Sequence, residues 1–276
     1  MKKYLLLGII IGGIVIFFIT KHDSLGKVVY EKNALTLEQH ASLPIPPKIE
    51  NPKIDTNAVD ITYLMGKFDP AKEKDFILIP GNYLVAKNTL YLRKETLDAF
   101  IKMRTNALKD GVTLNIVSAT RNFTSQKSIW ENKWTGKTIV AGENLKTKYP
   151  DGNDRFKKIL EFSSVPSTSR HHWGTDMDIN SVDPSYFNTV KGQKEYDWLA
   201  KNAKDYGFCQ PYSADRKTGY NEEKWHWSYV PLSKDFTNEY KKLINLKDIK
   251  GFLGDTYVKQ NDVINNYVLG INPDCL

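Results

Sequence analysis

The chain has 276 residues, of which 41% are hydrophobic, 12% aromatic and 26% charged. This composition is typical of a globular protein and excludes collagen-like, coiled-coil and wholly disordered chains. Lys and Arg number 39 and Asp and Glu 32, and the net charge of +7 suits an anionic surface or polymer without requiring nucleic acid. Two cysteines are too few for a disulfide scaffold or a cysteine-based zinc site.

The first 20 residues are predicted to be a transmembrane anchor. Residues 4–20 carry no charge, and as a helix they would reach about 25 Å, near the lower limit for crossing a bilayer. No small-residue cleavage site follows the run, so an uncleaved single-pass anchor in the cell membrane is favoured over a signal peptide. A slight positive-inside bias favours a cytoplasmic N-terminus, with the rest of the chain on the extracytoplasmic (periplasmic) side.

Residues 21–58 are predicted to be a proline-rich tether. Four prolines fall between positions 44 and 52, and they favour extended chain over packed structure. From residue 59 the pattern is globular to the C-terminus, which predicts one domain over residues 59–276 that is long enough to bury its own core.

The predicted elements of this domain mix helices and strands. In chain order they are a helix over 96–109, a strand over 114–120, a helix over 124–134 capped by Thr124, a helix over 195–206 ended by Gly207, a strand over 224–230 and a helix over 257–269. They do not alternate as regular βαβ units. The predicted fold class is therefore α+β, with a small antiparallel sheet flanked by helices.

The densest polar cluster is SRHHWGTDMDIN, residues 169–180. Its second half alternates, with Asp176, Asp178 and Asn180 on one face, as in an exposed edge strand. That interpretation accounts for the carboxylates, but it leaves the two histidines before Gly174 unexplained.

A zinc site is another interpretation of the same cluster. Zinc takes nitrogen and oxygen ligands, and a catalytic site keeps one position open for water. His171 and Asp178 lie on either side of Gly174, so a bend there could bring both side chains to one ion. Two of the histidines outside the cluster lie in the tether, which leaves His226 as a third ligand. Spacing alone leaves the zinc site and a merely polar surface as open alternatives.

Three motifs together resemble a known family. They are Ser118-x-x-Arg121-x-x-x-x-Gln126, Ser169-x-His171-x-x-Gly174-x-x-x-Asp178 and Glu223-x-x-His226. In this order they are similar to the VanY-like D-alanyl-D-alanine carboxypeptidases, which are zinc peptidases related to D-Ala-D-Ala dipeptidases and to the zinc domain of hedgehog proteins. The resemblance covers residues 60–275, including the opening segment 63–68. It departs at Asp176, where the family typically has a small residue, usually Ala.

The resemblance implies a metal site and a general base. His171, Asp178 and His226 would hold Zn²⁺ and leave one position for a water, whose pKa zinc lowers toward about 7. Glu223 would take the proton of that water and pass it to the leaving amine.

The resemblance also implies roles for the residues around the metal. Arg121 would bind the scissile carbonyl region and stabilise developing negative charge. Ser169 and Gln126 would form hydrogen bonds to the substrate or to the residues that support the site. His172 is expected to pack or to support the site, and the role of Asp176 stays open.

Strand alternation and the family resemblance select different residues as the general base. If the last strand began at residue 222, its period of two would put Glu222 on the face of His226. The family spacing selects Glu223 instead. The two agree if the strand begins only after the glutamates, so we expect residues 221–223 to end a loop and Glu223 to be the base.

The function implied by the resemblance is a membrane-anchored zinc carboxypeptidase that removes terminal D-alanine from peptidoglycan stem peptides. A D-Ala-D-Ala dipeptidase, an L,D-carboxypeptidase or a wall endopeptidase could use the same metal centre. A zinc-stabilised binding module without turnover is an alternative of another class, but it would need neither Arg121 nor Glu223. The expected partners are stem peptides and the membrane, with no nucleic acid.

The two cysteines, Cys209 and Cys275, are predicted to form a disulfide. An exported domain meets oxidising conditions, in which two cysteines can form one bridge. The bridge would hold a C-terminal tail that otherwise frays.

Overall fold

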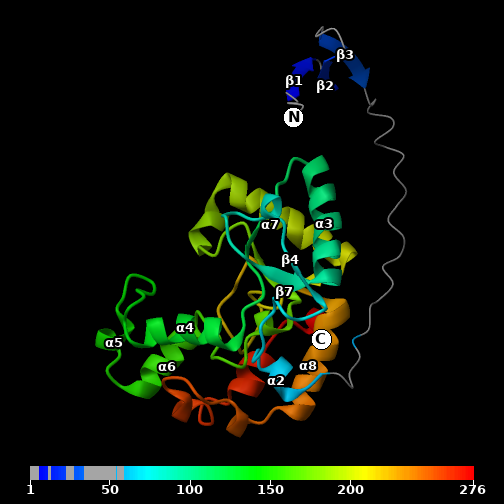
Figure 1. The fold of residues 1–276 in the computed structure, drawn as a ribbon. Coiled ribbons are helices and arrows are strands. Elements are labelled where there is room, and N and C mark those ends of the chain that lie inside the picture. Colours follow the sequence, from blue (N-terminus) through cyan, green and yellow to red (C-terminus); the bar gives the residue numbers. More distant parts are fainter. Residues whose placement is uncertain (1–5, 12–13, 23–27, 34–53, 55–58) are drawn as a thin grey trace. The chain divides into compact units, whose positions relative to one another are not determined.

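The computed structural model describes residues 6–11, 14–22, 28–33, 54 and 59–276 (Figure 1). The chain divides into two compact units, Met1–Ile49 and Glu50–Leu276.

The N-terminal unit has strands where the sequence predicts a membrane helix. Strands β1 (Leu6–Ile11), β2 (Ile14–His22) and β3 (Val28–Asn33) form an antiparallel sheet in the order β1-β2-β3. The run is rich in Ile and Val, whose β-branched side chains favour strands, so its apolar character does not by itself select a helix. Among the residues that the structure describes, no helix is long and apolar enough to cross a bilayer.

The helix predicted over residues 1–20 is thus not found in the described part of that segment. The predicted tether, residues 21–58, lies for most of its length outside the described residues.

The second unit contains a four-stranded antiparallel sheet. Its strands, in spatial order, are β6 (Ile116–Ser118), β7 (Asp176–Ile179), β9 (His226–Tyr229) and β8 (Phe208–Cys209). Strands β4 (Phe76–Leu78) and β5 (Tyr91–Arg93) pair separately. Sheets of this kind, with helices around them, confirm the predicted α+β class.

Helices surround these sheets. They are α2 (Ile61–Leu64), α3 (Lys94–Lys109), α4 (Phe123–Trp134), α5 (Leu145–Lys148), α6 (Gly152–Leu160), α7 (Val190–Asn202) and α8 (Val230–Leu243). Short 3-10 turns include η3 (Arg170–Trp173), η4 (Pro184–Asn188), η5 (Ala203–Tyr206), η7 (Asp255–Tyr257) and η9 (Pro273–Cys275), and η8 (Ile264–Val268) is a π turn. Helices α3 and α7 lie near one end of this unit, whereas α4, α5 and α6 form a separate group (Figure 1).

The structure confirms most predicted elements and corrects two details. Helix α4 is capped by Asn122 rather than Thr124, since the Asn122 side chain accepts a hydrogen bond from the Ser125 amide at 2.9 Å. The helix predicted over 257–269 is wrong: only the short turns η7 and η8 form there. Asp262 between them has a φ of 40°, outside the right-handed helical region, so no continuous helix can pass through it.

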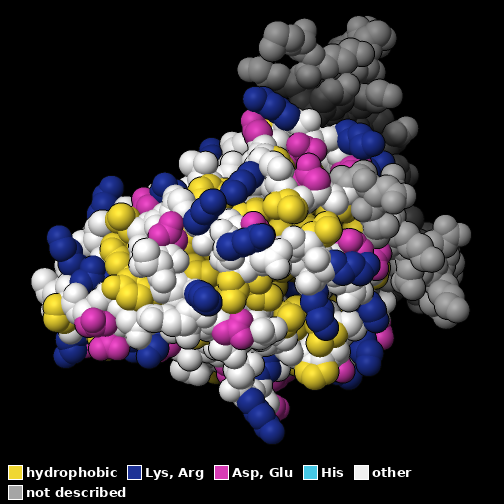
Figure 2. Space-filling model, turned by 90° about the horizontal axis from the view of Figure 1, so that it is seen from below, with side chains coloured by type: hydrophobic (Ala, Val, Ile, Leu, Met, Phe, Trp, Pro, Cys, Tyr) yellow, Lys and Arg dark blue, Asp and Glu magenta, His cyan; other side chains and the backbone are white. Residues whose placement is uncertain are grey.

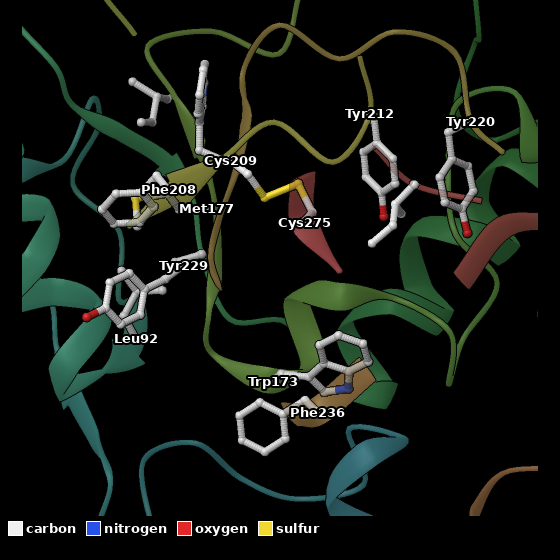
Figure 3. Close-up of a cluster of buried hydrophobic side chains, with 14 of the residues drawn as sticks. Leu92, Trp173, Met177, Phe208, Cys209, Tyr212, Tyr220, Tyr229, Phe236 and Cys275 are labelled. Carbon is white, nitrogen blue, oxygen red and sulfur yellow. A yellow bond between two sulfur atoms is a disulfide. The ribbon is translucent and has the colours of Figure 1, made fainter. Parts of the chain in front are cut away.

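The core fixes the segment that carries the two adjacent histidines. Trp173 is fully buried and stacks on Phe236 of α8, with ring centroids 6.1 Å apart (Figure 3). Its indole Nε1 donates a hydrogen bond to the carbonyl of Leu64 in α2 at 3.1 Å. Turn η3 is therefore held between two helices, which limits the freedom of the side chains beside Trp173.

The predicted disulfide between Cys209 and Cys275 is present in the structure (Figure 3). It joins β8 to the turn η9 at the C-terminus, with the two Cα atoms 5.7 Å apart. Cys275 is completely buried. The bridge thus secures the last residues of the chain to an edge of the central sheet.

The charged side chains are mixed on the surface. On the face in Figure 2, Lys and Arg side chains are spread over the described surface and interleaved with Asp and Glu. A nucleic-acid interface usually gathers its basic residues on one face or along one helix. The positive charge visible on this face has no such arrangement.

Candidate metal centre

A glycine turn brings the first two predicted ligands together. Turn η3 ends at Gly174, whose φ of 73° lies in the left-handed region, and β7 begins two residues later. A Cβ atom at Gly174 would lie 2.4 Å from the ring of Phe76, so a larger residue would fit neither the backbone nor the space. The chain reverses here, and His171 and Asp178 face the same point as predicted.

The third predicted ligand comes from the neighbouring strand. Asp178 and His226 are register partners in the antiparallel pair of β7 and β9, so their side chains are neighbours on one face of the sheet. The rings of His171 and His226 lie 4.6 Å apart. One potential ligand atom of each of these three residues lies within 4.8 Å of the other two.

The unsatisfied atoms of these residues fit a cation. His171 Nδ1 donates a hydrogen bond to the carbonyl of Ala119 at 2.8 Å, which leaves Nε2 with its lone pair. This Nε2 lies 3.4 Å from Asp178 Oδ1, and both atoms are buried without a hydrogen-bond partner in the protein. Two buried acceptors that face each other are costly unless a positive charge lies between them. Two imidazole nitrogens and a carboxylate oxygen are a ligand set that zinc takes in hydrolytic enzymes.

The protonation states of two of these residues suit metal binding. Burial lowers the pKa of His171, and the nearby Arg121 lowers it further, so the imidazole stays neutral. Burial alone would raise the pKa of Asp178, but the nearby imidazoles of His171 and His226 and the guanidinium of Arg121 hold that pKa well below its usual range. A neutral histidine and an ionised aspartate are the forms that bind a metal.

His226 has an acidic partner at each ring nitrogen. Its Nε2 lies 2.9 Å from Asp176 Oδ2, and its Nδ1 lies 3.2 Å from Glu223 Oε2 and 3.4 Å from Asp178 Oδ1. Burial would lower the pKa of His226, but the hydrogen bonds to Asp176 and Glu223 outweigh burial and raise it to about 9 in the metal-free protein. A metal at Nδ1 would therefore replace a proton.

Glu223 ends a loop, as the sequence analysis expected. Strand β9 begins at His226, so Glu222 and Glu223 lie before it, outside the strand's alternation. The Glu223 amide donates a hydrogen bond to the carbonyl of Tyr212 at 2.9 Å, and Gln210 Nε2 donates to the Glu223 carbonyl at 3.0 Å. These backbone bonds fix the Glu223 carboxylate beside the potential ligands.

The three potential ligands lie in a cleft of about 890 Å³. Of the other residues predicted for the site, Arg121, Gln126 and Glu223 also line the cleft. Gln126 is buried, and its Nε2 donates to the carbonyl of Ser164 at 2.7 Å, so it supports the cleft wall. Ser169 is buried as well, but it is not among the cleft-lining residues, and its hydroxyl has no hydrogen-bond partner in the protein.

His172 supports Arg121 rather than the potential ligands. Its Nδ1 donates to the carbonyl of Arg121 at 2.6 Å, and its Nε2 accepts from the Ser167 amide at 3.1 Å. Burial lowers the pKa of His172 to about 3. The neutral ring thus ties the segment of Arg121 to η3, as the expected packing role requires.

Lys133 is a residue of the cleft that the sequence analysis missed. It lies on α4 seven residues after Gln126, about two helical turns, so both side chains are on one face of the helix. That spacing is the signal that could have found it. Its Nζ donates to the hydroxyl of Ser163, and burial together with Arg121 lowers its pKa to about 8, against an opposing effect of Glu223.

The position of Asp176 corrects the interpretation of 176–180 as an exposed edge strand. All four residues of β7 are buried, because the strand lies between β6 and β9. Asp176 is completely buried and contacts His226 and Arg170. Strand alternation predicted its face but not the burial of the strand.

A buried set of potential metal ligands with a carboxylate beside it, in a cleft, defines a candidate hydrolytic metalloenzyme. The model of the VanY family, D-alanyl-D-alanine carboxypeptidase, matches residues 89–232, which is more than half of the chain and contains all three motifs. This chain belongs to the VanY family.

Two curated relatives are similar over parts of their length. The putative carboxypeptidase YodJ of Bacillus subtilis is 29% identical over 194 residues, which cover 66% of this chain and 62% of YodJ. A D-alanyl-D-alanine carboxypeptidase of Enterococcus faecalis is 38% identical over 128 residues, which cover 46% of this chain and 43% of the relative. The matches therefore span less than two thirds of each of these relatives.

Solved structures of similar proteins include the LdcB LD-carboxypeptidase and VanYB in complex with D-alanine-D-alanine. LdcB has a TM-score of 0.46 and 24% identity, over 70% of this chain and 80% of that one. VanYB has a TM-score of 0.44 and 24% identity, over 60% of this chain and 88% of that one.

Proposed function

We propose that this chain is a zinc-dependent D,D-carboxypeptidase, which hydrolyses the last peptide bond of peptidoglycan stem peptides and releases D-alanine. The observation that carries the proposal is the buried group of His171, Asp178 and His226 with Glu223 3.2 Å from His226. Membership of the VanY family supports the same reaction class. A binding module would not need a carboxylate beside the potential ligands.

His171, Asp178 and His226 would hold the zinc ion through Nε2, a carboxylate oxygen and Nδ1. When bound, zinc supplies a Lewis acid that lowers the pKa of a coordinated water toward about 7. The Glu223 carboxylate lies beside His226 and would serve as the general base of the hydrolysis and then as the general acid for the leaving amine. Arg121 lines the same cleft and would stabilise the negative charge that develops on the carbonyl oxygen.

The cations of the cleft support an exopeptidase. A carboxypeptidase must bind the free carboxylate of the terminal residue. Arg121 and Lys133 both line the cleft, and Lys133 has no acidic residue within ion-pair distance among the described residues. We assign Lys133 to this carboxylate, which leaves Arg121 for the scissile carbonyl.

A membrane anchor and an extracytoplasmic domain belong to the same proposal. The uncharged run of residues 4–20 supports an anchor. The disulfide of Cys209 and Cys275 supports an oxidising compartment, where stem peptides are found and where such bridges persist.

The product of hydrolysis tests the proposal. The purified, zinc-loaded chain is incubated with a pentapeptide ending in D-Ala-D-Ala and with the tetrapeptide that lacks the last residue, and the products are identified by mass. We expect one alanine to leave the pentapeptide and the tetrapeptide to stay intact. Loss of a dipeptide would indicate a D-Ala-D-Ala dipeptidase, loss of alanine from the tetrapeptide an L,D-carboxypeptidase, and an internal cut an endopeptidase. Each of these results would contradict the proposed D,D-carboxypeptidase.

A further inference from the structure

Asp176 is the residue at which this chain departs from the motif it otherwise matches, and its carboxylate is fully engaged. It is completely buried. Its Oδ1 accepts hydrogen bonds from the hydroxyls of Thr175 at 2.7 Å and Ser228 at 2.9 Å. Its Oδ2 lies 3.0 Å from Arg170 Nε and 2.9 Å from His226 Nε2. Such a carboxylate has one orientation available.

The contact with His226 decides which ring nitrogen faces the metal. A carboxylate that is paired with the Arg170 guanidinium and accepts from two hydroxyls is ionised, and an ionised carboxylate only accepts hydrogen bonds. The Nε2 of His226 must therefore carry a hydrogen, and the lone pair of a neutral ring is then on Nδ1. Nδ1 is the atom that faces Asp178 Oδ1 at 3.4 Å, inside the group of potential ligands.

Arg170 holds the carboxylate from the other side. Its guanidinium is completely buried and donates to Asp176, to Thr237 Oγ1 in α8 at 3.0 Å and to Ser228 Oγ in β9 at 2.8 Å. It also lies over the ring of Trp173, with its Cζ atom 4.9 Å from the ring centroid. The ion pair is thus fixed to a helix, a strand and the core at once.

We infer that Asp176 is a positioning residue for the metal site: it holds His226 with Nε2 protonated and Nδ1 directed at the ion, and Arg170 holds Asp176 in place. The inference rests on the proposed metal site and on no particular peptide bond. Loss of a carboxylate that holds a ligating histidine in this way typically lowers metal affinity about 10- to 100-fold.

Asp176 also has a simpler possible role, which is to neutralise the buried Arg170. Removing one partner of a buried ion pair leaves an uncompensated charge and is strongly destabilising, whereas removing both is often tolerated. The two roles therefore predict different results for a double substitution. If Asp176 only neutralises Arg170, the double variant regains the parent's zinc affinity. If Asp176 positions His226, the affinity stays low.

The experiment measures zinc affinity of the full chain by competition with a chromophoric chelator. The variants are Asp176→Ala, Arg170→Met and the double Arg170→Met/Asp176→Ala, with thermal unfolding of the metal-free proteins to follow the fold. We expect the double variant to fold and to bind zinc about 10- to 100-fold more weakly than the parent. A double variant within threefold of the parent would overturn the inference.

A matched control and a second measurement complete the test. Glu195→Ala removes another buried carboxylate, one that accepts from the Tyr186 hydroxyl at 2.6 Å, and it should leave zinc affinity unchanged. If the variants do not fold, ¹⁵N spectra of the zinc-loaded parent decide the question: the inference requires a hydrogen on Nε2 of His226 and the metal on Nδ1. The reverse assignment would contradict it.

Zinc affinity is measured without peptide, so the outcomes separate the inference from the proposed function. A parent that binds zinc and cleaves no peptide would defeat the function alone. A parent that cleaves peptide, with a double variant that binds zinc as well as the parent does, would defeat the inference alone.

Discussion

Asp178 and His226 stand directly opposite each other in the pairing of β7 and β9, and 3.4 Å separates Asp178 Oδ1 from His226 Nδ1. In an antiparallel pair of strands, directly opposite residues have neighbouring side chains, so the strand register alone places Asp178 beside His226. The third potential ligand, His171, is brought in by the turn at Gly174. Two potential ligands thus lie on rigid strands and one on a turn that the core holds in place.

The two adjacent histidines should respond differently to substitution. His171→Ala removes a potential ligand, and we expect the purified variant to contain little zinc. His172→Ala should keep its zinc, because His172 binds only backbone groups of Arg121 and Ser167. It should lower the free energy of unfolding by about 1–3 kcal/mol, since a buried amide loses its acceptor. Metal analysis and chemical denaturation measure the two effects; equal zinc loss in both variants would contradict the assignment.

Glu223 and Glu222 form a matched pair for the general base. Glu223→Ala should lower turnover by roughly two to four orders of magnitude, the usual scale for a general base, while zinc stays bound. Glu222→Ala should remain within a few-fold of the parent, because the residue facing His226 at 3.2 Å is Glu223. Steady-state rates at saturating peptide, with zinc content measured on the same samples, test the pair. The opposite ranking would mean that the motif is misaligned around His226.

Lys133 gives the cleft a dependence on pH. Its pKa of about 8 means that the ammonium is mostly charged at pH 7 and mostly neutral at pH 9. If it binds the substrate carboxylate, KM should rise as the pH increases through about 8. Lys133→Arg should remove this rise, since an arginine stays charged throughout. Lys133→Met should raise KM below about pH 8, where the parent's lysine is charged, and should approach the parent's KM at higher pH. A KM profile that is the same in the parent and in both variants would exclude Lys133 from carboxylate binding.

The disulfide should stabilise the domain without acting on the metal. Cys209 and Cys275 are 66 residues apart, and for a loop of this size chain entropy gives an upper estimate of roughly 4 kcal/mol. We expect Cys275→Ser to lower the free energy of unfolding by up to that amount and to leave zinc affinity unchanged. Denaturation of the parent under reducing conditions is the control, and it should match the variant. Equal stability of parent and variant would leave the bridge without a structural role.

The sequence predicted the parts of the site that local pattern and motif spacing determine. The turn at Gly174, the facing of His171 and Asp178, and the loop position of Glu223 follow from short segments of chain. The arrangement around Asp176 does not. Strand alternation predicts on which face of β7 Asp176 lies. Whether β7 is an edge strand or an inner strand, however, depends on β6 and β9, which are distant in sequence.

Two segments have sequence patterns that suit more than one structure. The segment 257–269 has helical periodicity, but the backbone at Asp262 interrupts it. The apolar run of residues 4–20 satisfies the length rule for a membrane helix, yet its β-branched residues also suit the strands β1 and β2. In both segments hydrophobic pattern alone does not decide the backbone conformation.

The most direct test of the central claim is a zinc titration of activity. The metal-free chain receives increasing zinc, and D-alanine release from a peptide ending in D-Ala-D-Ala is measured alongside bound zinc. The proposed site predicts that activity is absent without metal and rises in proportion to bound zinc, reaching its plateau at one ion per chain. Full D-alanine release by the metal-free chain, or no release after one ion has bound, would contradict it.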